Sequence, residues 1–276
     1  MLIVGEKINA TRRQVAKLVR EHDTAGLVDL ARCQEQAGAH YIDVNVGTGS
    51  GSQADEIADM RWAATAVGAA VASRLCIDSA DPEVLRAGLE ASNGQPPMIN
   101  SAKAEDENLE QVLSLARRFD TTLVALVMDE SGISPTVEGR LKACEKIADA
   151  CRRHDVPLDR VYFDPLVLPV SADVGQGLVT LATISEIKRR YPESKTIMGL
   201  SNVSYGLPAR QRLNSAFLHM AVHAGLDAAI ANPMNEELMA AVKTAEVLVG
   251  RDRHCRRYVK AFRVPAKPPN GLEVGA

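Results

Sequence analysis

The stretch LCIDSADPEVLRAGLEAS at residues 75–92 contains one complete structural unit of this chain. Its apolar first part predicts a strand over residues 75–79. Asp81 followed by Pro82 supplies a helix N-cap and a proline at the first helical position, so the rest predicts a helix over residues 81–92. A strand that leads directly into a helix is typical of βαβ units, in which successive strands run parallel.

The same alternation continues along the whole sequence. Apolar runs rich in β-branched residues predict strands at residues 2–8, 41–46, 75–79, 97–101, 122–128, 160–164, 196–200 and 227–231. Amphipathic stretches predict helices at about 23–38, 53–72, 81–92, 106–119, 136–154, 176–191, 208–225 and 235–249. Eight strand–helix units in 276 residues favour closure of the sheet, so we expect an α/β fold with a single (β/α)8 TIM-barrel domain over residues 1–263. Residues 264–276 contain proline and glycine and little to bury, and are predicted to form a flexible C-terminal tail.

Composition and charge exclude several classes of protein. With 46% apolar and 24% charged residues the chain is globular, and a net charge of -3 offers no basic surface for nucleic acid. No stretch reaches the roughly 18 uncharged apolar residues of a membrane span, and the start MLIVGEKINA lacks the features of a secretory leader, so we expect a cytoplasmic protein. The five cysteines are scattered without a CxxC spacing, which argues against a disulfide framework and a thiolate metal site.

Polar side chains stand at or just beyond the end of every expected strand, including Asn9 after the first and Asp129 after the fifth. A parallel barrel gathers the carboxyl ends of its strands into one mouth, where ligands bind. Turns also favour Asp and Asn, but a carboxylate inside an apolar run, such as Asp43, Asp78 or Asp164, is costly unless it has a partner. We therefore expect the following residues to surround one site: Glu6, Asp43, Asn45, Asp78, Asn100, Asp164, Asn202 and Asn232.

The chemistry of this mouth limits its ligand. Carboxylates and carboxamides with almost no cationic residue at the strand ends suit a neutral ligand rich in hydrogen-bond donors. A pterin ring fits, because its amino group and ring N–H form a guanidine-like edge that a carboxylate can accept in a paired, charge-assisted way. A hard divalent cation is the competing use of the same groups, but the amides and the lack of a clustered ligand motif disfavour it, so no metal site is expected.

Seven segments together resemble one known family. They are GEKIN at 5–9, GAHYIDVNVG at 38–47, CIDS at 76–79, MINSA at 98–102, YFDPLVLP at 162–169, GLSNVSYGLP at 199–208 and GLDAAIANP at 225–233. In this order they closely resemble the pterin-binding, cobalamin-dependent methyltransferases. These comprise the methyltetrahydrofolate:corrinoid protein methyltransferases of acetogens and the second methyltransferases of anaerobic demethylation systems.

The resemblance implies an enzyme of one-carbon metabolism and different roles for several residues in the barrel mouth. It implies a barrel, usually a homodimer, that binds tetrahydrofolate while a separate corrinoid protein carries the cobalamin. A methyl group would move between N5 of tetrahydrofolate and the cobalt. Asn202 would lie near N5 as the catalytic residue, Gly199 and Ser201 would line the floor of the ring, and the polar edge of the pterin would be held by Asp78, Asn100 and Asp164.

Two other functions remain alternatives. A dihydropteroate-synthase-like enzyme shares the pterin-in-barrel scheme, but it should show Ser-Thr-Arg after the second strand and a basic residue on the seventh, where this chain has VGTGSGS and GLSN. A non-catalytic folate-binding subunit would have no need of an amide at N5. The corrinoid-binding signature DxHxxG is incomplete, because Arg257 stands where its glycine should be, so we expect the corrinoid on a partner protein.

The sequence leaves several points open. One transition state serves both directions of methyl transfer, so the direction cannot be read from the residues. The identity of the corrinoid partner and the upstream methyl donor are equally unspecified. Four mouth residues receive no role from the resemblance: Glu6, Asp43, Asn45 and Asn232.

Overall fold

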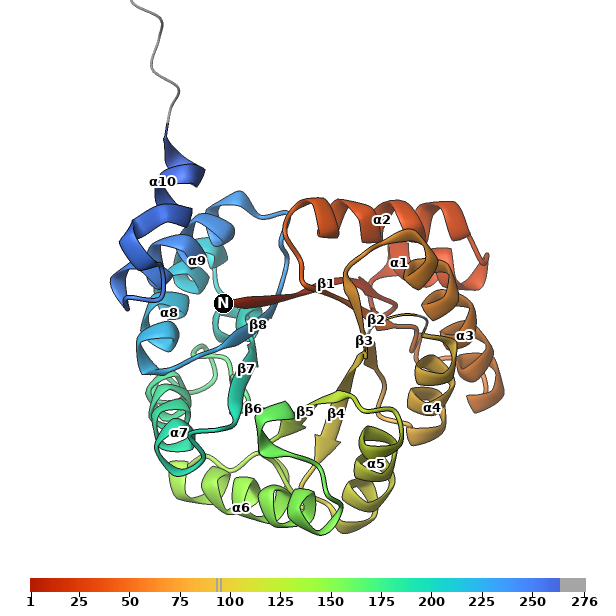
Figure 1. The fold of residues 1–276 in the computed structure, drawn as a ribbon, viewed down its shortest axis with the longest axis horizontal. Helices are drawn as coiled ribbons and strands as arrows, with labels where there is room; N and C mark the ends of the chain where they lie inside the picture. Colours follow the sequence, from red (N-terminus) through yellow and green to blue (C-terminus); the bar gives the residue numbers. More distant parts are fainter. Residues whose placement is uncertain (93, 95, 264–276) are drawn as a thin grey trace, which may run out of the picture.

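Eight parallel strands close into a barrel in the order of the chain. The computed structural model describes residues 1–92, 94 and 96–263, so the tail predicted over 264–276 lies outside the described residues. Each strand pairs with the next, and β1 pairs with β8 to complete the ring (Figure 1). The strands are β1 (Leu2–Asn9), β2 (Tyr41–Asn45), β3 (Arg74–Asp78), β4 (Met98–Lys103), β5 (Thr122–Leu126), β6 (Val161–Asp164), β7 (Lys195–Gly199) and β8 (Ala228–Ala231). The expected (β/α)8 TIM barrel is confirmed.

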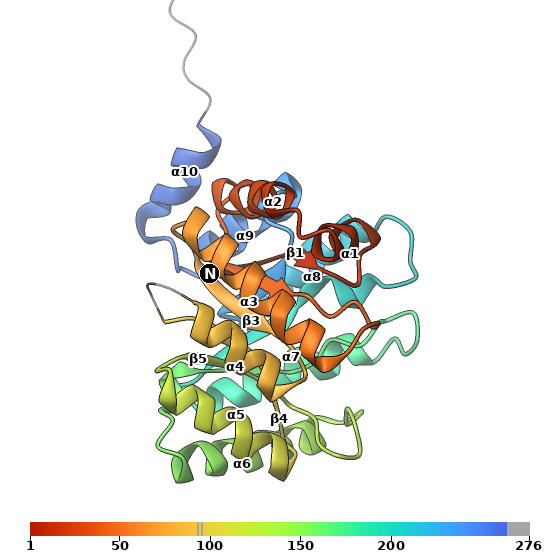
Figure 2. The same cartoon turned by 90° about the vertical axis from the view of Figure 1, so that its right-hand side faces the viewer.

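Helices surround the strands in chain order. Figure 2 shows α3 to α6 side by side along one flank, and α10 beyond the ring next to α9. The helices are α1 (Arg13–Arg20), α2 (Thr24–Gln36), α3 (Gln53–Ala70), α4 (Pro82–Ala91), α5 (Asp106–Arg118), α6 (Val137–Arg153), α7 (Gln176–Arg190), α8 (Arg210–Ala224), α9 (Glu236–Leu248) and α10 (Arg256–Phe262). Short 3-10 turns lie at η1 (Leu158–Arg160), η2 (Leu200–Ser204) and η3 (Arg253–Cys255).

The sequence analysis missed two helices, α1 and α10. It found no helix at 13–20 or 256–262 because both segments are short and carry many basic residues. No residue of α10 is buried, so the core does not stabilise this helix. The eight helices that were expected all form, with ends within a few residues of the prediction.

Alternation along the strands decides what fills the barrel. One buried residue from each strand forms the inner core: Val4, Tyr41, Cys76, Met98, Val124, Tyr162, Ile197 and Ala228. Side chains two residues apart point to the same side of a strand, so the next inward positions lie closer to the carboxyl ends. Those positions are Glu6, Asp43, Asp78, Asn100, Leu126, Asp164, Gly199 and Ile230. The apolar core is thus followed by a largely polar layer at the mouth.

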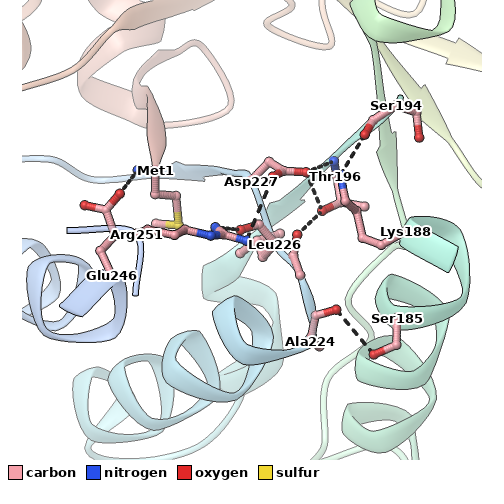
Figure 3. Close-up of polar contacts among 11 residues, drawn as sticks. Met1, Ser185, Lys188, Ser194, Thr196, Ala224, Leu226, Asp227, Glu246 and Arg251 are labelled. Atoms are coloured by element: carbon pink, nitrogen blue, oxygen red, sulfur yellow. Dashed lines mark hydrogen bonds and ion pairs between the residues drawn. The ribbon is translucent and has the colours of Figure 1, made fainter. Parts of the chain in front are cut away.

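The opposite end of the barrel is held together by ion pairs and hydrogen bonds. Asp227, just before β8, accepts hydrogen bonds from the Thr196 backbone N–H at 3.0 Å and from Lys188 Nζ at 3.0 Å (Figure 3). In the same view the N-terminal ammonium group of Met1 pairs with Glu246. Because these contacts join strand starts to helices far from the mouth, they contribute to stability rather than to ligand binding.

Helix α4, the second half of the strand–helix unit at residues 75–92, packs closely on the barrel. Asp81 caps α4 by accepting a hydrogen bond from the Glu83 N–H at 2.8 Å, with Pro82 at the start of the helix, as expected. Further along, α4 approaches the barrel at Gly88. A Cβ atom at this position would lie 2.6 Å from Ile77 Cγ2 and 3.0 Å from Met60 Cγ.

We therefore expect Gly88→Ala to destabilise the protein. The β-branched side chain of Ile77 cannot move aside easily, so overpacking should cost about 1–3 kcal/mol in the free energy of unfolding, measured by urea denaturation. Gly68→Ala is the matched control, because its Cβ would lie 3.5 Å from Leu75 Cδ1, an ordinary contact. Equal stability of the two variants would contradict the close approach of α4.

Candidate active site

Three neighbouring strands bring two carboxyl groups and two amides together. Asp43 on β2, Asp78 on β3 and Asn100 on β4 all point into the mouth. Asn45 Nδ2 donates a hydrogen bond to Asp78 Oδ2 at 2.9 Å. Asn100 Nδ2 lies 3.4 Å from Asp43 Oδ1. The Cys76 thiol also hydrogen-bonds the Asp43 carboxyl from below. These contacts give Asp43 and Asn45 a structural place that the sequence analysis left open.

Burial raises the pKa of both Asp43 and Asp78, but their neighbours affect the two carboxyl groups differently. Asp43 is buried, and desolvation followed by repulsion from Asp78 raises its pKa well above the usual range. Burial also raises the pKa of Asp78, but hydrogen bonds from Asn45 and Asp43 favour its charged form. The pKa of Asp43 is thus raised by both burial and repulsion, which favours a proton on Asp43, whereas its hydrogen bonds favour the charge on Asp78.

A third carboxyl group lies on β6, two strands further around the barrel. Asp164 Oδ1 accepts a hydrogen bond from the Leu166 backbone N–H at 2.8 Å, and the Gly199 backbone N–H also donates to this carboxyl. Burial raises the pKa of Asp164 to about 7, while these N–H groups and the positive charge of Arg140 oppose the rise. The charge of Asp164 is thus balanced close to neutral pH.

The turn after β7 presents an exposed amide above the polar layer. Asn202 lies in η2 and is exposed, and no residue in the described part of the chain hydrogen-bonds its side chain. A Cβ atom on Gly199 would lie 3.3 Å from Asn202 Nδ2, so glycine leaves room beneath this amide. Arg210 fixes the turn by donating hydrogen bonds to Ser201 O at 2.6 Å and to Ser204 Oγ at 3.0 Å. The turn that carries Asn202 is therefore fixed, while the amide itself is open to a ligand.

Two further mouth residues are engaged in local contacts. Glu6 pairs with Arg12 at 3.2 Å, and its pKa is raised because burial outweighs the nearby positive charges. Asn232 Oδ1 accepts a hydrogen bond from the Met234 N–H at 3.2 Å, a turn contact two residues away. Glu6 reaches the inner layer, whereas the amide oxygen of Asn232 is used by its own loop.

The strand ends carry few cations, as expected, but basic side chains from other parts of the chain reach the mouth. Arg12 reaches Glu6, and the charge of Arg210 also acts on Glu6 from the start of α8. Lys103 ends β4 itself. The sequence analysis considered mainly strand ends, but long basic side chains from loops and helices extend over the rim. Arg210 and the buried Arg140 were missed for this reason, since an arginine in a charged helix has the pattern of a solvated face.

Metal ligands do not gather in this mouth. Over the described residues, no three His, Cys, Asp or Glu side chains lie close enough together to hold a metal ion. The donor set offers instead a buried and a half-buried carboxyl group on neighbouring strands, a third carboxyl group on β6, and the unengaged amide of Asn202. This combination suits an organic ring with several N–H donors.

Comparison with known proteins decides the family. Residues 5–232 match the family described as pterin binding enzyme. The chain belongs to this family of pterin-binding enzymes. A methylcorrinoid:tetrahydrofolate methyltransferase from Eubacterium limosum is 36% identical over 265 residues, which span 95% of this chain and 96% of that protein. A methionine synthase from Mycobacterium tuberculosis is 32% identical over 253 residues, which span 85% of this chain but 21% of that longer protein. The family and enzyme expected from the seven motifs are confirmed.

Solved structures of dihydropteroate synthases have the same fold. The enzyme from Stenotrophomonas maltophilia, with imidazole bound in its active site, aligns with a TM-score of 0.70 at 17% identity, covering 90% of this chain and 92% of that one. The Coxiella burnetii enzyme in complex with pteroic acid gives 0.68 at 17% identity, covering 89% and 94%. At this identity the likeness supports the barrel fold and nothing about the reaction.

We expect Asp164→Asn to stabilise the free protein, increasingly as the pH rises. Because the pKa of Asp164 is raised to about 7 from an ordinary 3.8, the native carboxyl has no penalty below about pH 4. The loss of stability grows between about pH 4 and about pH 7, where the unfolded chain is ionised and the native carboxyl is still protonated. It levels off above this range at roughly 4 kcal/mol, and asparagine removes it. Chemical denaturation of both proteins at pH 5 and pH 8 measures the difference.

The control for this prediction is Asp173→Asn in the loop before α7. Asp173 accepts hydrogen bonds from the Gly175 N–H and from Gln176, which lower its pKa, so its replacement should give no gain in stability with rising pH. A stability difference for Asp164→Asn that is the same at both pH values would contradict the raised pKa.

Proposed function

We propose that this protein moves a methyl group between N5 of tetrahydrofolate and the cobalt of a corrinoid carried by a separate protein. One observation carries the proposal: the mouth combines carboxyl groups at Asp43, Asp78 and Asp164 with an unengaged amide at Asn202. The full-length likeness to a methylcorrinoid:tetrahydrofolate methyltransferase supports the same reaction. Both directions use the same transition state, so either direction is compatible with these residues.

The carboxyl layer is proposed to recognise the pterin. The amino group and adjacent ring N–H can donate two hydrogen bonds to one carboxylate, which is the strongest arrangement available to this edge. Asp78 fits this role because the hydrogen bonds from Asn45 and Asp43 favour its charged form. Asn100 and Asp164 would bind the remaining polar atoms of the ring. Asp164 binds best as a carboxylate, so affinity for tetrahydrofolate should rise with pH around neutrality.

The amide of Asn202 is proposed to act at N5. Methyl transfer between nitrogen and cobalt is an in-line displacement, which needs orientation and charge adjustment rather than a covalent nucleophile on the protein. A carboxamide can accept from an N–H and can also donate to a lone pair, so it can follow N5 as its charge and protonation change. Gly199 and Ser201 would line the floor beneath the ring, with Arg210 holding the turn in place.

Loss of the amide should reduce turnover far more than binding. We expect Asn202→Ala to lower the rate of methyl transfer by about a hundredfold or more, the usual effect of removing one donor to a transition state. Its affinity for tetrahydrofolate should stay within about threefold of the wild type. The protein is mixed with free methylcobalamin and tetrahydrofolate, and the cobalamin spectrum and methyltetrahydrofolate are followed. Calorimetry gives the dissociation constant.

Asn232→Ala is the matched control, because it removes a mouth amide that serves its own turn. A wild-type rate in Asn202→Ala would exclude this residue from the chemistry. Absence of tetrahydrofolate binding by the wild type would overturn the proposed function. Binding without transfer to methylcobalamin or any corrinoid protein would favour the non-catalytic folate-binding subunit. Dihydropteroate formation would favour the synthase-like alternative.

The corrinoid protein is proposed to contact an apolar ridge beside the mouth. The cobalt must reach N5 above the barrel, so its carrier must touch the loops that follow the strands. Val174 in the loop before α7, Leu178 in the first turn of α7 and Tyr205 in the turn after β7 are 87%, 66% and 66% exposed. Large apolar side chains exposed together at a rim are typical of a surface that binds a protein.

Negative charges introduced on this ridge should therefore lower the efficiency of methyl transfer with a corrinoid protein. We expect the double change Val174→Asp and Leu178→Asp to reduce kcat/KM about tenfold or more with a corrinoid protein that the wild type accepts, and to leave transfer from free methylcobalamin unchanged. Leu248→Asp is the control, since Leu248 is 73% exposed at the end of α9, away from the mouth. Equal effects on both methyl carriers would contradict docking at the ridge.

A cytoplasmic homodimer, implied by the family resemblance, stays a prediction. Leu213 and Met220 lie seven residues apart on α8 and are partly exposed, which gives this helix an apolar stripe for a second copy. Sedimentation equilibrium of the purified chain measures its oligomeric state. Among the described residues, the helices are all too short or too polar to cross a membrane.

A further inference from the structure

Arg140 is a fully buried cation in the wall of the mouth. It lies in the first turn of α6, and every nitrogen of its guanidinium group donates to a neutral oxygen. Nε donates to Ser134 O at 2.9 Å. Nη1 donates to Pro165 O at 2.9 Å, to Leu166 O at 3.0 Å and to Thr180 Oγ1 at 3.2 Å. Nη2 donates to Gln176 Oε1 at 2.8 Å. One side chain thus joins the loop before α6, the loop after β6 and the start of α7.

A buried charge of this kind needs a reason. Moving a charge out of water is costly, and a buried arginine is usually paired with a carboxylate. The acceptors around Arg140 are carbonyl, hydroxyl and amide oxygens, with no carboxylate in hydrogen-bond contact among them. The carboxylate that its charge acts on is Asp164, next in sequence to the two carbonyl groups that it binds.

We propose that Arg140 is the positioning residue for Asp164, because its guanidinium group fixes the two peptide carbonyls that follow Asp164 and supplies a positive charge beside this carboxyl group. This inference rests on the proposed function only in the step from Asp164 to the pterin. The arrangement of Arg140 and Asp164 belongs to the free protein.

The geometric part of this role acts through Leu166. Leu166 has a φ angle of +64°, a left-handed conformation that a leucine adopts only when its surroundings impose it. Arg140 and Thr180 both bind the Leu166 carbonyl, at 3.0 Å and 3.4 Å. The same residue directs its N–H at Asp164 Oδ1, 2.8 Å away. That N–H belongs to the same peptide as the Pro165 carbonyl, which Arg140 also binds, so the guanidinium group holds the peptide that orients the Asp164 carboxyl group.

The electrostatic part acts on the charge of Asp164. Burial raises the pKa of this carboxyl to about 7, and the attraction of Arg140 is among the forces that limit the rise. Without the positive charge, Asp164 would be protonated at neutral pH and would lose its charge-assisted bonds to an N–H donor. Placing the cation behind a loop keeps it away from the ligand while its field still reaches the carboxyl group.

Two variants separate charge from geometry. Arg140→Gln removes the charge and keeps a hydrogen-bonding group, whereas Arg140→Lys keeps the charge and loses most of the fixed hydrogen bonds. The pKa of Asp164 is measured in the free protein by carbon-13 NMR of labelled aspartate carboxyl groups, with Asp164→Asn to assign the signal. Lys142→Gln, on an exposed position of the same helix, is the matched control for loss of a charge.

We expect Arg140→Gln to raise the titration midpoint of the Asp164 carboxyl group by about one pH unit or more. Arg140→Lys should leave this midpoint near the wild-type value. Tetrahydrofolate affinity at pH 7 should fall about tenfold in Arg140→Gln and recover partly at higher pH, where Asp164 ionises. In Arg140→Lys it should fall at every pH alike. An Asp164 midpoint in Arg140→Gln equal to that of the wild type and Lys142→Gln would overturn the proposal.

Two further measurements decide the proposal if the Arg140 variants do not fold or if tetrahydrofolate does not bind. If both Arg140 variants fail to fold, Thr180→Val removes one anchor of the guanidinium group and of Leu166 and should still raise the Asp164 midpoint; no change would overturn the proposal. If the wild type binds no tetrahydrofolate, the proposed function fails, but the NMR midpoint still decides whether Arg140 governs Asp164.

Discussion

The alternation of side chains along parallel strands is the constraint on which this molecule depends. In a closed barrel every second residue must point inward, and the inner space is narrow enough for side chains to fill it. An apolar layer at Tyr41 and Cys76 closes the interior, and the next inward positions, at Asp43 and Asp78, open on the mouth. Shifting one strand by a single residue would move its carboxyl group to the outside and destroy the site.

Polar groups at this depth are tolerated because they satisfy one another. The raised pKa of Asp43 favours its protonated form beside Asp78. Asp78 in turn accepts a hydrogen bond from the Asn45 amide. Asp164 is held by backbone N–H groups and by the field of Arg140. Part of the stability of the barrel is thus given up to keep charged or ionisable groups in place before a ligand arrives, and the contacts at Asp227 on the opposite end help to offset this cost.

Binding and chemistry are proposed to be divided between two parts of the mouth. The strands hold the carboxyl groups, which vary little in position because each lies in a paired backbone. The amide of Asn202, proposed to act at N5, lies instead in a 3-10 turn that Arg210 fixes at Ser201 and Ser204. A rigid floor with an exposed amide above it suits a reaction that needs a ring to be oriented and a charge on one atom to be adjusted.

Local patterns in the sequence determined the barrel, its strand order and most members of the polar ring, because periodicity and turn chemistry depend on neighbouring residues alone. They did not indicate α1 and α10, which are short and rich in basic residues, or the cations of Arg12 and Arg210 above the rim. Only the tertiary structure decided that Asn45 pairs with Asp78, that the pKa of Asp43 is strongly raised, and that Arg140 is buried behind Asp164. These properties depend on which strands become neighbours and on how much water each group loses, and distant residues decide both.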